Sequence, residues 1–160
     1  AQARFIVSAI SRLHTYHGVS FNIEGSEQAL AACEKDDLSE MFGNLIDNAV
    51  KYTPEGGCVT VRTRTTDFAL LEVEDDGPGI PENERDLIFE RFYRVLGNEV
   101  PGSGLGLAIV QEIAELHRGS VQIKPGPSGR GILAQAVFPR RRFTISALLA
   151  QSPEKFQPSL

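Results

Sequence analysis

Two runs of alternating apolar and polar residues, separated by a short break, constrain the fold of this chain most strongly. Residues 58–65 read CVTVRTRT and residues 68–75 read FALLEVED. Each run alternates with the period of two that is typical of a half-buried β-strand, and together they predict an antiparallel hairpin. Residues 120–125 and 131–139 predict a second pair of strands around the turn sequence GPSGR.

Three further segments are predicted to be helices, and two more to be strands. The helices are expected at residues 1–17, 36–53 and 106–118, and the strands at 19–24 and 29–33. The helix at 36–53 carries an apolar stripe at helical spacing, formed by Leu38, Met41, Phe42, Leu45 and Ala49.

Several residues carry helix start and stop signals. Asp36 or Asp37 can cap the second predicted helix, and Pro54 and Gly56 stop it. Ser103 or one of its neighbours is expected to cap the third helix.

The order of these elements predicts an α+β fold. The strands come largely in hairpins, so we expect a two-layer α/β sandwich with a mixed, mostly antiparallel sheet of about five strands, covered on one face by about three helices. Residues 82–94 predict a short helix or two, and residues 95–104 a flexible loop. The domain is expected to span residues 1–139, with residues 140–160 as a C-terminal tail.

Composition excludes some classes of function. The chain has 160 residues and a formal net charge of −5, which fits one domain and argues against binding to DNA, RNA or acidic membranes. Cys33 and Cys58 lack metal-type spacing, so we interpret them as reduced, partly buried thiols. No apolar run approaches the roughly 18 residues of a membrane span.

The helix predicted at 36–53 carries an unusual polar stripe. Glu40, Asn44, Asn48 and Tyr52 recur every four residues, and Lys51 lies close to the same side. One interpretation is a solvated helix face. The alternative is a ligand-facing surface, because amide oxygens can complete a Mg²⁺ shell, an ammonium group can neutralise phosphate, and a phenol ring can stack on a base.

A glycine-rich loop precedes the last predicted helix. Gly102, Gly104 and Gly106 alternate in VPGSGLGLAIV, residues 100–110. Glycine lets backbone N–H groups approach an anion, and a helix N-terminus adds partial positive charge. The loop lacks the Gly-Lys-Ser/Thr ending of a P-loop, and no βαβ unit surrounds it as in a Rossmann fingerprint.

Two aspartates end one strand of the first hairpin, in the sequence VEDDGPGIP at residues 73–81. An ordinary turn would explain the glycines and proline. Alternatively, Asp75 can accept a hydrogen bond from the exocyclic amine of adenine, where guanine presents a carbonyl, while Gly77 and Gly79 let the flat base approach the backbone.

The segment IFERFYR, residues 88–94, places aromatic residues beside arginines. Packing of Phe89, Phe92 and Tyr93 on the core is the simplest interpretation. Arg91 and Arg94 lie just before the flexible loop, where they can meet phosphate or a partner.

In this order the four motifs resemble the nucleotide-binding domain of sensor histidine kinases, whose ATP fold is shared with gyrase-type ATPases and Hsp90. NLIDNAVKY resembles the N box, DDGPG the G1 box, IFERFYR the F box and GSGLGLAIV the G2 box. The resemblance covers roughly residues 1–139. It implies binding of ATP with Mg²⁺ under a mobile lid.

The resemblance implies a role for each matched residue. Asp75 binds the adenine amine, Gly77 and Gly79 shape the pocket floor, and Tyr52 packs near the adenine. Further cofactor contacts are implied for the rest of the G1, F and G2 boxes, namely Ile80, Phe92, Arg94, Gly102, Ser103, Gly104, Leu105, Gly106 and Leu107, among which the three alternating glycines hinge the lid.

The N box is implied to handle metal and phosphate. Asn44 matches a Mg²⁺ ligand, and Asn48 and Lys51 match residues that approach the phosphates. Glu40 lies four residues before Asn44, where gyrase-type relatives carry a water-activating base, so its catalytic role is a hypothesis.

The kinase reaction also needs a nucleophilic histidine, which in this family lies in a separate helical dimerisation domain. Nothing here resembles its motif, and His14, His17 and His117 lie at helix ends, where a capping or surface role is expected. We therefore expect a monomeric catalytic fragment that needs the helical domain, passes phosphate to a response regulator, and contacts neither nucleic acid nor membrane. Its parent is expected to be a membrane-anchored sensor with this part in the cytoplasm.

Three rival interpretations stay open at the level of sequence. The chain can be another ATPase or a serine kinase with the same fold, or a non-catalytic nucleotide-binding module that signals by lid closure. A purely structural interaction domain would require the four motifs to have arisen in order for packing alone.

Overall fold

The computed structural model describes three stretches of the chain, residues 19–25, 35–93 and 104–139. Three predicted segments lie outside the described residues: the helix at 1–17, the strand at 29–33 and the tail at 140–160.

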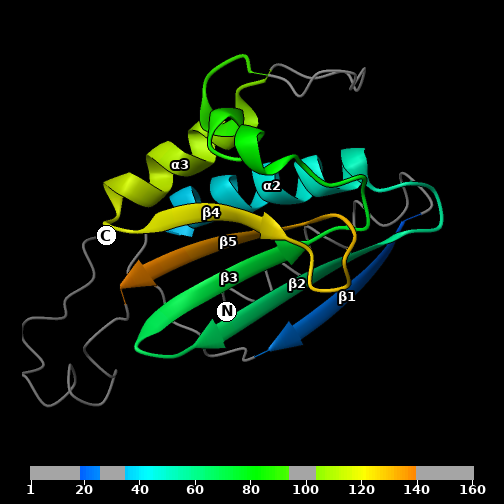
Figure 1. Ribbon diagram of the computed structural model, residues 1–160. Coiled ribbons are helices and arrows are strands. Elements are labelled where there is room, and N and C mark those ends of the chain that lie inside the picture. The colour runs from blue at the N-terminus through cyan, green and yellow to red at the C-terminus, as the bar shows by residue number, and fades with distance from the viewer. Residues whose placement is uncertain (1–18, 26–34, 94–103, 140–160) are drawn as a thin grey trace, which may run out of the picture.

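One five-stranded sheet forms the base of the domain (Figure 1). Its order is β1-β2-β3-β5-β4, with β1 parallel to β2 and every other neighbouring pair antiparallel. The predicted mixed, mostly antiparallel sheet and both predicted hairpins are therefore confirmed. The strands are β1 (Ser20–Gly25), β2 (Cys58–Thr65), β3 (Phe68–Glu74), β4 (Ser120–Pro125) and β5 (Ile132–Pro139).

The described helices lie on one face of this sheet (Figure 1). The α-helices are α2 (Lys35–Tyr52) and α3 (Gly106–Leu116), which pack against each other. Two short 3₁₀ helices, η1 (Glu82–Glu84) and η2 (Leu87–Phe89), follow β3, as predicted for residues 82–94. This arrangement confirms the α+β class.

The core fills the space between the helices and the sheet. The predicted apolar stripe of α2 is entirely buried there, and Val59, Val61, Leu71 and Val73 face it from β2 and β3. Because side chains alternate across a strand, the residues between these positions point to the opposite face.

That opposite face, called here the far face, carries the charged residues Arg62, Arg64, Glu72 and Glu74 together with the neutral amide of Gln135. Arg62 donates from Nη1 to Glu74 Oε2 at 2.7 Å, and this hydrogen bond raises the pKa of the arginine. Arg64 donates to Glu72, and Gln135 Nε2 donates to the same carboxylate at 2.9 Å. Polar side chains thus satisfy one another across neighbouring strands.

The predicted helix caps are wrong in detail. Helix α2 begins at Lys35, so Asp36 and Asp37 lie inside its first turn, where their charge still favours the positive end of the helix. The cap position of α3 is Leu105, which makes no side-chain capping hydrogen bond, and Ser103 lies outside the described residues.

Candidate functional site

Helix α2 presents the predicted polar stripe along one side. Glu40 and Lys51 are exposed, whereas Asn44, Asn48 and Tyr52 are half-buried. The half-burial means that these side chains face a neighbouring part of the molecule rather than open solvent alone.

Asn44 brings the N box against the start of α3. Its Nδ2 donates to the carbonyl of Glu40 at 3.0 Å, one turn earlier in the helix. A Cβ placed on Gly106 would lie 3.3 Å from Asn44 Oδ1. The amide oxygen therefore lies against the first residue of α3, and two motifs separated by 62 residues meet there.

Lys51 has a partner that the sequence interpretation did not anticipate. Its Nζ lies 2.8 Å from Asp47 Oδ2, one turn earlier on α2. Both side chains are substantially exposed, so this ion pair is weak and can exchange for another anion.

The two aspartates after β3 have different contacts. Asp76 Oδ2 accepts the backbone N–H of Cys58 at 2.8 Å and so links the end of β3 to the start of β2. Asp75 is 2% exposed, and its Oδ1 accepts the N–H groups of Gly77 at 2.9 Å and Ile132 at 3.3 Å. Asp76 therefore connects two strands of the sheet, whereas Asp75 accepts hydrogen bonds from two separate backbone segments.

Burial changes the acid–base behaviour of Asp75. Removal from water raises the pKa of this carboxyl group above its ordinary value, and the hydrogen bonds from Gly77 and Ile132 oppose that shift. No cation is paired with Asp75 among the ion pairs of the described residues. A buried carboxylate supported by N–H donors alone is suited to accept a further hydrogen bond from a ligand.

Gly77 brings the end of α2 and the Asp75 carboxylate together. A Cβ on this residue would lie 2.7 Å from the carbonyl oxygen of Tyr52 and 3.0 Å from Asp75 Oδ1. Since real Cβ atoms do not approach so closely, the contact requires glycine. Gly79 has a positive φ of 80°, which also favours glycine.

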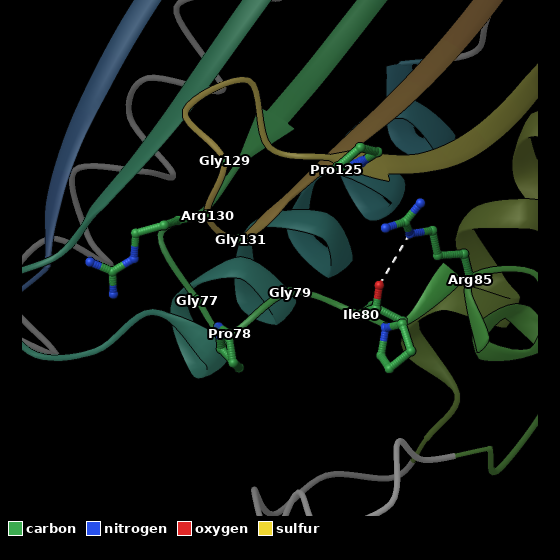
Figure 2. Close-up of a pocket in the computed structure, with 10 residues that line it drawn as sticks. Gly77, Pro78, Gly79, Ile80, Arg85, Pro125, Gly129, Arg130 and Gly131 are labelled. Atoms are coloured by element: carbon green, nitrogen blue, oxygen red, sulfur yellow. Dashed lines mark hydrogen bonds between the residues drawn. The ribbon is translucent and has the colours of Figure 1, made fainter. Parts of the chain in front are cut away.

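An open hollow of about 470 Å³ lies beside these glycines. Figure 2 shows that it is bounded by the loop containing Gly77, Pro78 and Gly79 and by the β4–β5 turn, residues 126–131. Arg85 lies at one side, where its Nε donates to the carbonyl of Ile80 at 3.1 Å. None of the residues that line this hollow comes from α2 or α3, as far as the described part of the chain shows.

The F box connects to the G2 box through the backbone. Phe92 has a positive φ of 65°, and its N–H donates to the carbonyl of Gly104 at 2.9 Å. A Cβ on Gly104 would lie 2.9 Å from the Phe92 Cα atom. The two ends of the intervening segment, residues 93–103, are therefore held together.

The aromatic residues of the F box divide into core and surface. Phe89 is buried as expected and Tyr93 packs against the core, whereas Phe92 is 71% exposed, so core packing is wrong for that residue. The Tyr93 hydroxyl donates to Glu84 Oε1 at 2.7 Å, which raises the pKa of the phenol.

His117 does more than end a helix. Its Nε2 lies 2.7 Å from Asp37 Oδ2, so the half-buried imidazole connects the end of α3 to the start of α2. His117 occupies the C-cap position of α3, in line with the expected capping role, and its side chain also packs between the two helices. His14 and His17 lie outside the described residues.

The structure places most, but not all, of the predicted site residues. Asn44 meets Gly106, Tyr52 meets Gly77 beside Asp75, and Phe92 meets Gly104. Leu105 and Leu107 flank Gly106 at the start of α3, and both are half-buried. Three predicted site residues fall outside the described residues: Arg94, Gly102 and Ser103.

Two contacts of Asp75 were missed by sequence reasoning, those with Gly131 and Ile132. Gly131 and Ile132 were interpreted as the start of a strand only, and no local signal connects them to an aspartate so far away in the chain.

The described residues show neither a metal-binding cluster nor a membrane-spanning helix. They contain no cluster of three or more His, Cys, Asp or Glu residues that could hold a metal ion. Cys58 is half-buried as expected, and Cys33 lies outside them. No helix within them is long and apolar enough to cross a membrane.

Solved structures of histidine kinases share this fold. The mycobacterial sensor histidine kinase MprB superposes with a TM-score of 0.79 at 33% identity, over 88% of this chain and 97% of that structure. The nucleotide-free catalytic domain of histidine kinase ThkA gives 0.73 at 21% identity, over 87% and 91% of the two chains, and supports the fold alone.

Curated relatives agree with this likeness. The sensor protein kinase PmrB of Pseudomonas aeruginosa is 41% identical over 119 residues, which are 73% of this chain and 25% of PmrB. The histidine-protein kinase/phosphatase MprB of Mycobacterium tuberculosis is 47% identical over 117 residues, 69% of this chain and 23% of MprB. This chain thus spans about a quarter of the length of these relatives.

The family model described as histidine kinase-, DNA gyrase B- and HSP90-like ATPase matches residues 33–142, which include α2, the loop after β3 and α3. This range holds the contacts of Asn44 with Gly106 and of Gly77 with Tyr52 and Asp75. The chain therefore belongs to the family of histidine kinase-, DNA gyrase B- and HSP90-like ATPases.

Proposed function

We propose that this chain binds ATP with Mg²⁺ and is the catalytic half of a sensor histidine kinase. The observation that carries the proposal is the convergence of the motifs in space: Asp75 and Tyr52 meet through Gly77, and Asn44 meets Gly106. The names of the relatives support a kinase over the other members of the family.

Asp75 recognises the base in this proposal. Its ionised carboxylate accepts a hydrogen bond from the 6-amino group of adenine, and guanine is rejected because its carbonyl would face the carboxylate. Gly77, Gly79 and Ile80 form the floor of the pocket, and the ring of Tyr52 packs near the base.

The N box serves the phosphates. Asn44 Oδ1 is an amide oxygen, a type of ligand that Mg²⁺ accepts alongside phosphate oxygens and waters. The bound ion would neutralise charge on the triphosphate. Asn48 and Lys51 approach the phosphates, Lys51 by exchanging Asp47 for the nucleotide. Leu105, Gly106 and Leu107 close the site from α3, with the remaining G2 and F box contacts at Gly102, Ser103, Gly104, Phe92 and Arg94.

Phosphoryl transfer requires a second domain. An imidazole nitrogen of a histidine on a helical phosphoacceptor domain attacks the γ-phosphorus of ATP, the bond to the β-phosphate oxygen breaks, and ADP leaves. Glu40 is exposed on the stripe one turn before Asn44, and we keep it as the candidate base. The phosphate then passes to an aspartate of a response regulator. We place this domain in the cytoplasm, where ATP is available.

Calorimetry tests the binding step. We expect wild-type protein to bind ATP more tightly with Mg²⁺ than without it, and to reject GTP. Asn44→Ala should lose most of the Mg²⁺-dependent gain. Asn22→Ala is the matched control, because this asparagine lies on the far face, where its Nδ2 donates to Glu24 Oε1 at 2.8 Å.

Addition of a helical phosphoacceptor domain tests the kinase step. Radiolabelled ATP should then label a histidine of the added domain, and Glu40→Gln should slow this labelling without weakening ATP binding. Rapid ATP hydrolysis without any partner, or label on serine, would favour another ATPase or a serine kinase. Absence of ATP binding by folded wild-type protein would favour an interaction module.

A further inference from the structure

The β4–β5 turn, residues 126–131, is closed by its own hydrogen bonds. It is followed by Ile132, which contacts Asp75. Within the turn, the Gly126 N–H donates to the carbonyl of Gly131 at 3.1 Å, and the Gly129 N–H donates to that of Gly126 at 3.0 Å. The next residue, Ile132, contacts Asp75 twice. Its carbonyl accepts the Asp75 N–H at 3.0 Å, and its own N–H donates to Asp75 Oδ1 at 3.3 Å.

Gly131 lies against Asp75 with no room for a side chain. Its φ is +67°, and an added Cβ would lie 1.8 Å from the Asp75 carbonyl oxygen and 2.7 Å from Asp75 Oδ1. Gly129 provides an internal contrast, because its φ is +82° but an added Cβ would meet nothing within 4 Å. The two glycines share a left-handed backbone conformation that is strained for other residues, and of the two only Gly131 lies against the carboxylate.

We propose that Gly131 is a positioning residue of the nucleotide site, which sets the orientation of the Asp75 carboxylate and so governs recognition of the adenine 6-amino group. This inference rests on the proposed function of Asp75. The turn leads into Ile132, whose N–H donates to Oδ1, and the Gly77 N–H donates to the same oxygen from a separate backbone segment. With Oδ1 fixed by two donors, Oδ2 is directed toward the ligand.

A side chain at residue 131 can be accommodated only if the turn moves away from Asp75. The turn borders an open hollow rather than packed side chains (Figure 2). Displacement of the turn is therefore expected in Gly131→Ala, instead of collapse of the core. That displacement draws the Ile132 N–H away from Oδ1 and lets the carboxylate rotate.

The test compares ATP with purine riboside triphosphate, which lacks the 6-amino group but keeps the ring and phosphates. Calorimetry with Mg²⁺ is performed on wild type, Gly131→Ala and Gly129→Ala. In wild type, ATP should bind at least roughly tenfold more tightly than the purine analogue, as expected for a hydrogen bond to a charged group. Gly131→Ala should lose most of this ratio, with little change in affinity for the analogue.

The outcomes separate this inference from the proposed function. Equal binding of ATP and the analogue by wild type would mean that Asp75 does not recognise the amine, and the proposed function of that residue would fail. A wild-type preference that persists in Gly131→Ala would overturn the positioning role alone. The same loss in Gly129→Ala would also overturn it, because backbone strain would then explain the effect.

A measurement on wild-type protein covers the case in which Gly131→Ala does not fold. Amide exchange followed by NMR should slow at Ile132 and Gly77 when ATP binds, relative to the purine analogue, and should not change at Gly129. Equal exchange at Ile132 with both nucleotides would contradict the proposal.

Discussion

Glu72 and Asp75 are both almost completely buried at one end of β3, yet their surroundings differ. Glu72 is 1% exposed and lies on the far face, where Arg64 and Gln135 donate to it. Asp75 is 2% exposed and, among the described residues, receives hydrogen bonds from the backbone N–H groups of Gly77 and Ile132 alone. One buried charge is neutralised by a cation, and the other is supported by amide dipoles.

This difference supports our proposal that Asp75, rather than Glu72, binds a ligand. An ion pair satisfies a carboxylate within the fold, so Glu72 has little capacity left for an outside partner. Asp75 keeps its acceptor capacity at the cost of desolvation, which raises its pKa. Burial alone therefore does not mark a functional acid, whereas burial without a cation among the described residues supports the ligand-binding role that we propose for Asp75.

The largest expected effect is loss of ATP affinity in Asp75→Asn. The amide oxygen can still accept the Gly77 and Ile132 N–H groups, but the amide nitrogen presents a donor to the adenine amine. We expect affinity to fall at least about tenfold by calorimetry. Glu72→Gln, an equally conservative change at an equally buried position, should alter ATP affinity less than about twofold. A similar loss in both variants would remove the distinction.

Arg64→Met should lower the stability of the fold and leave ATP affinity unchanged. Loss of the guanidinium leaves Glu72 buried with Gln135 as its remaining described donor, so we expect destabilisation by about 1–3 kcal/mol in urea unfolding. Half of the Arg64 side chain is exposed, which keeps the effect below that of a fully buried pair. ATP affinity should be unchanged, and a loss would connect the far face to the site.

The pH dependence of stability tests whether burial raises the pKa of Asp75. Because the folded-state pKa of Asp75 is raised, its contribution to stability is fully present below the unfolded pKa of about 3.9 and is lost as pH rises through the folded-state pKa. Asp75→Asn lacks this loss, so the variant should gain stability relative to wild type as pH rises from 4 to 7. Thermal unfolding across that range measures the difference, and a constant difference would exclude a raised pKa.

The smallest effect is expected at Lys51. Asp47→Ala removes its exposed partner and should change the free energy of unfolding by less than about 0.5 kcal/mol. Release of the lysine should raise ATP affinity by about twofold, since less competition opposes its approach to the phosphates. Glu24→Ala, which removes an exposed partner of Arg62 on the far face, is the control. Weaker ATP binding in Asp47→Ala would contradict a phosphate role for Lys51.

Secondary-structure elements and helix faces could be predicted from the sequence, because they depend on local periodicity. The alternation of CVTVRTRT defined β2 at both ends, and the four-residue spacing from Glu40 to Tyr52 defined the polar side of α2. The motif order also located the Asp75 region. These signals are local because strand pleat and helical turn repeat over a few residues.

Contacts between distant segments were not predictable in this way. The Ile132 N–H reaches Asp75 across 57 residues, and Arg62 reaches Glu24 across 38. Such contacts depend on strand order and register, which place β5 beside β3 and β1 beside β2. The special role of Gly131 follows from its neighbour in space, and its sequence context resembles any glycine-rich turn.

The hydrogen bond between Phe92 and Gly104 has a consequence for how this domain tolerates insertions. It closes the base of the segment between the F and G2 boxes, so a change of length inside that segment need not alter the positions of η2 or α3. Loop closure costs only about 0.6 kcal/mol for each doubling of length. A peptide inserted between Arg94 and Gly102 should therefore leave the folding of η2 and α3 unchanged, although it can alter the nucleotide contacts that we propose for this segment.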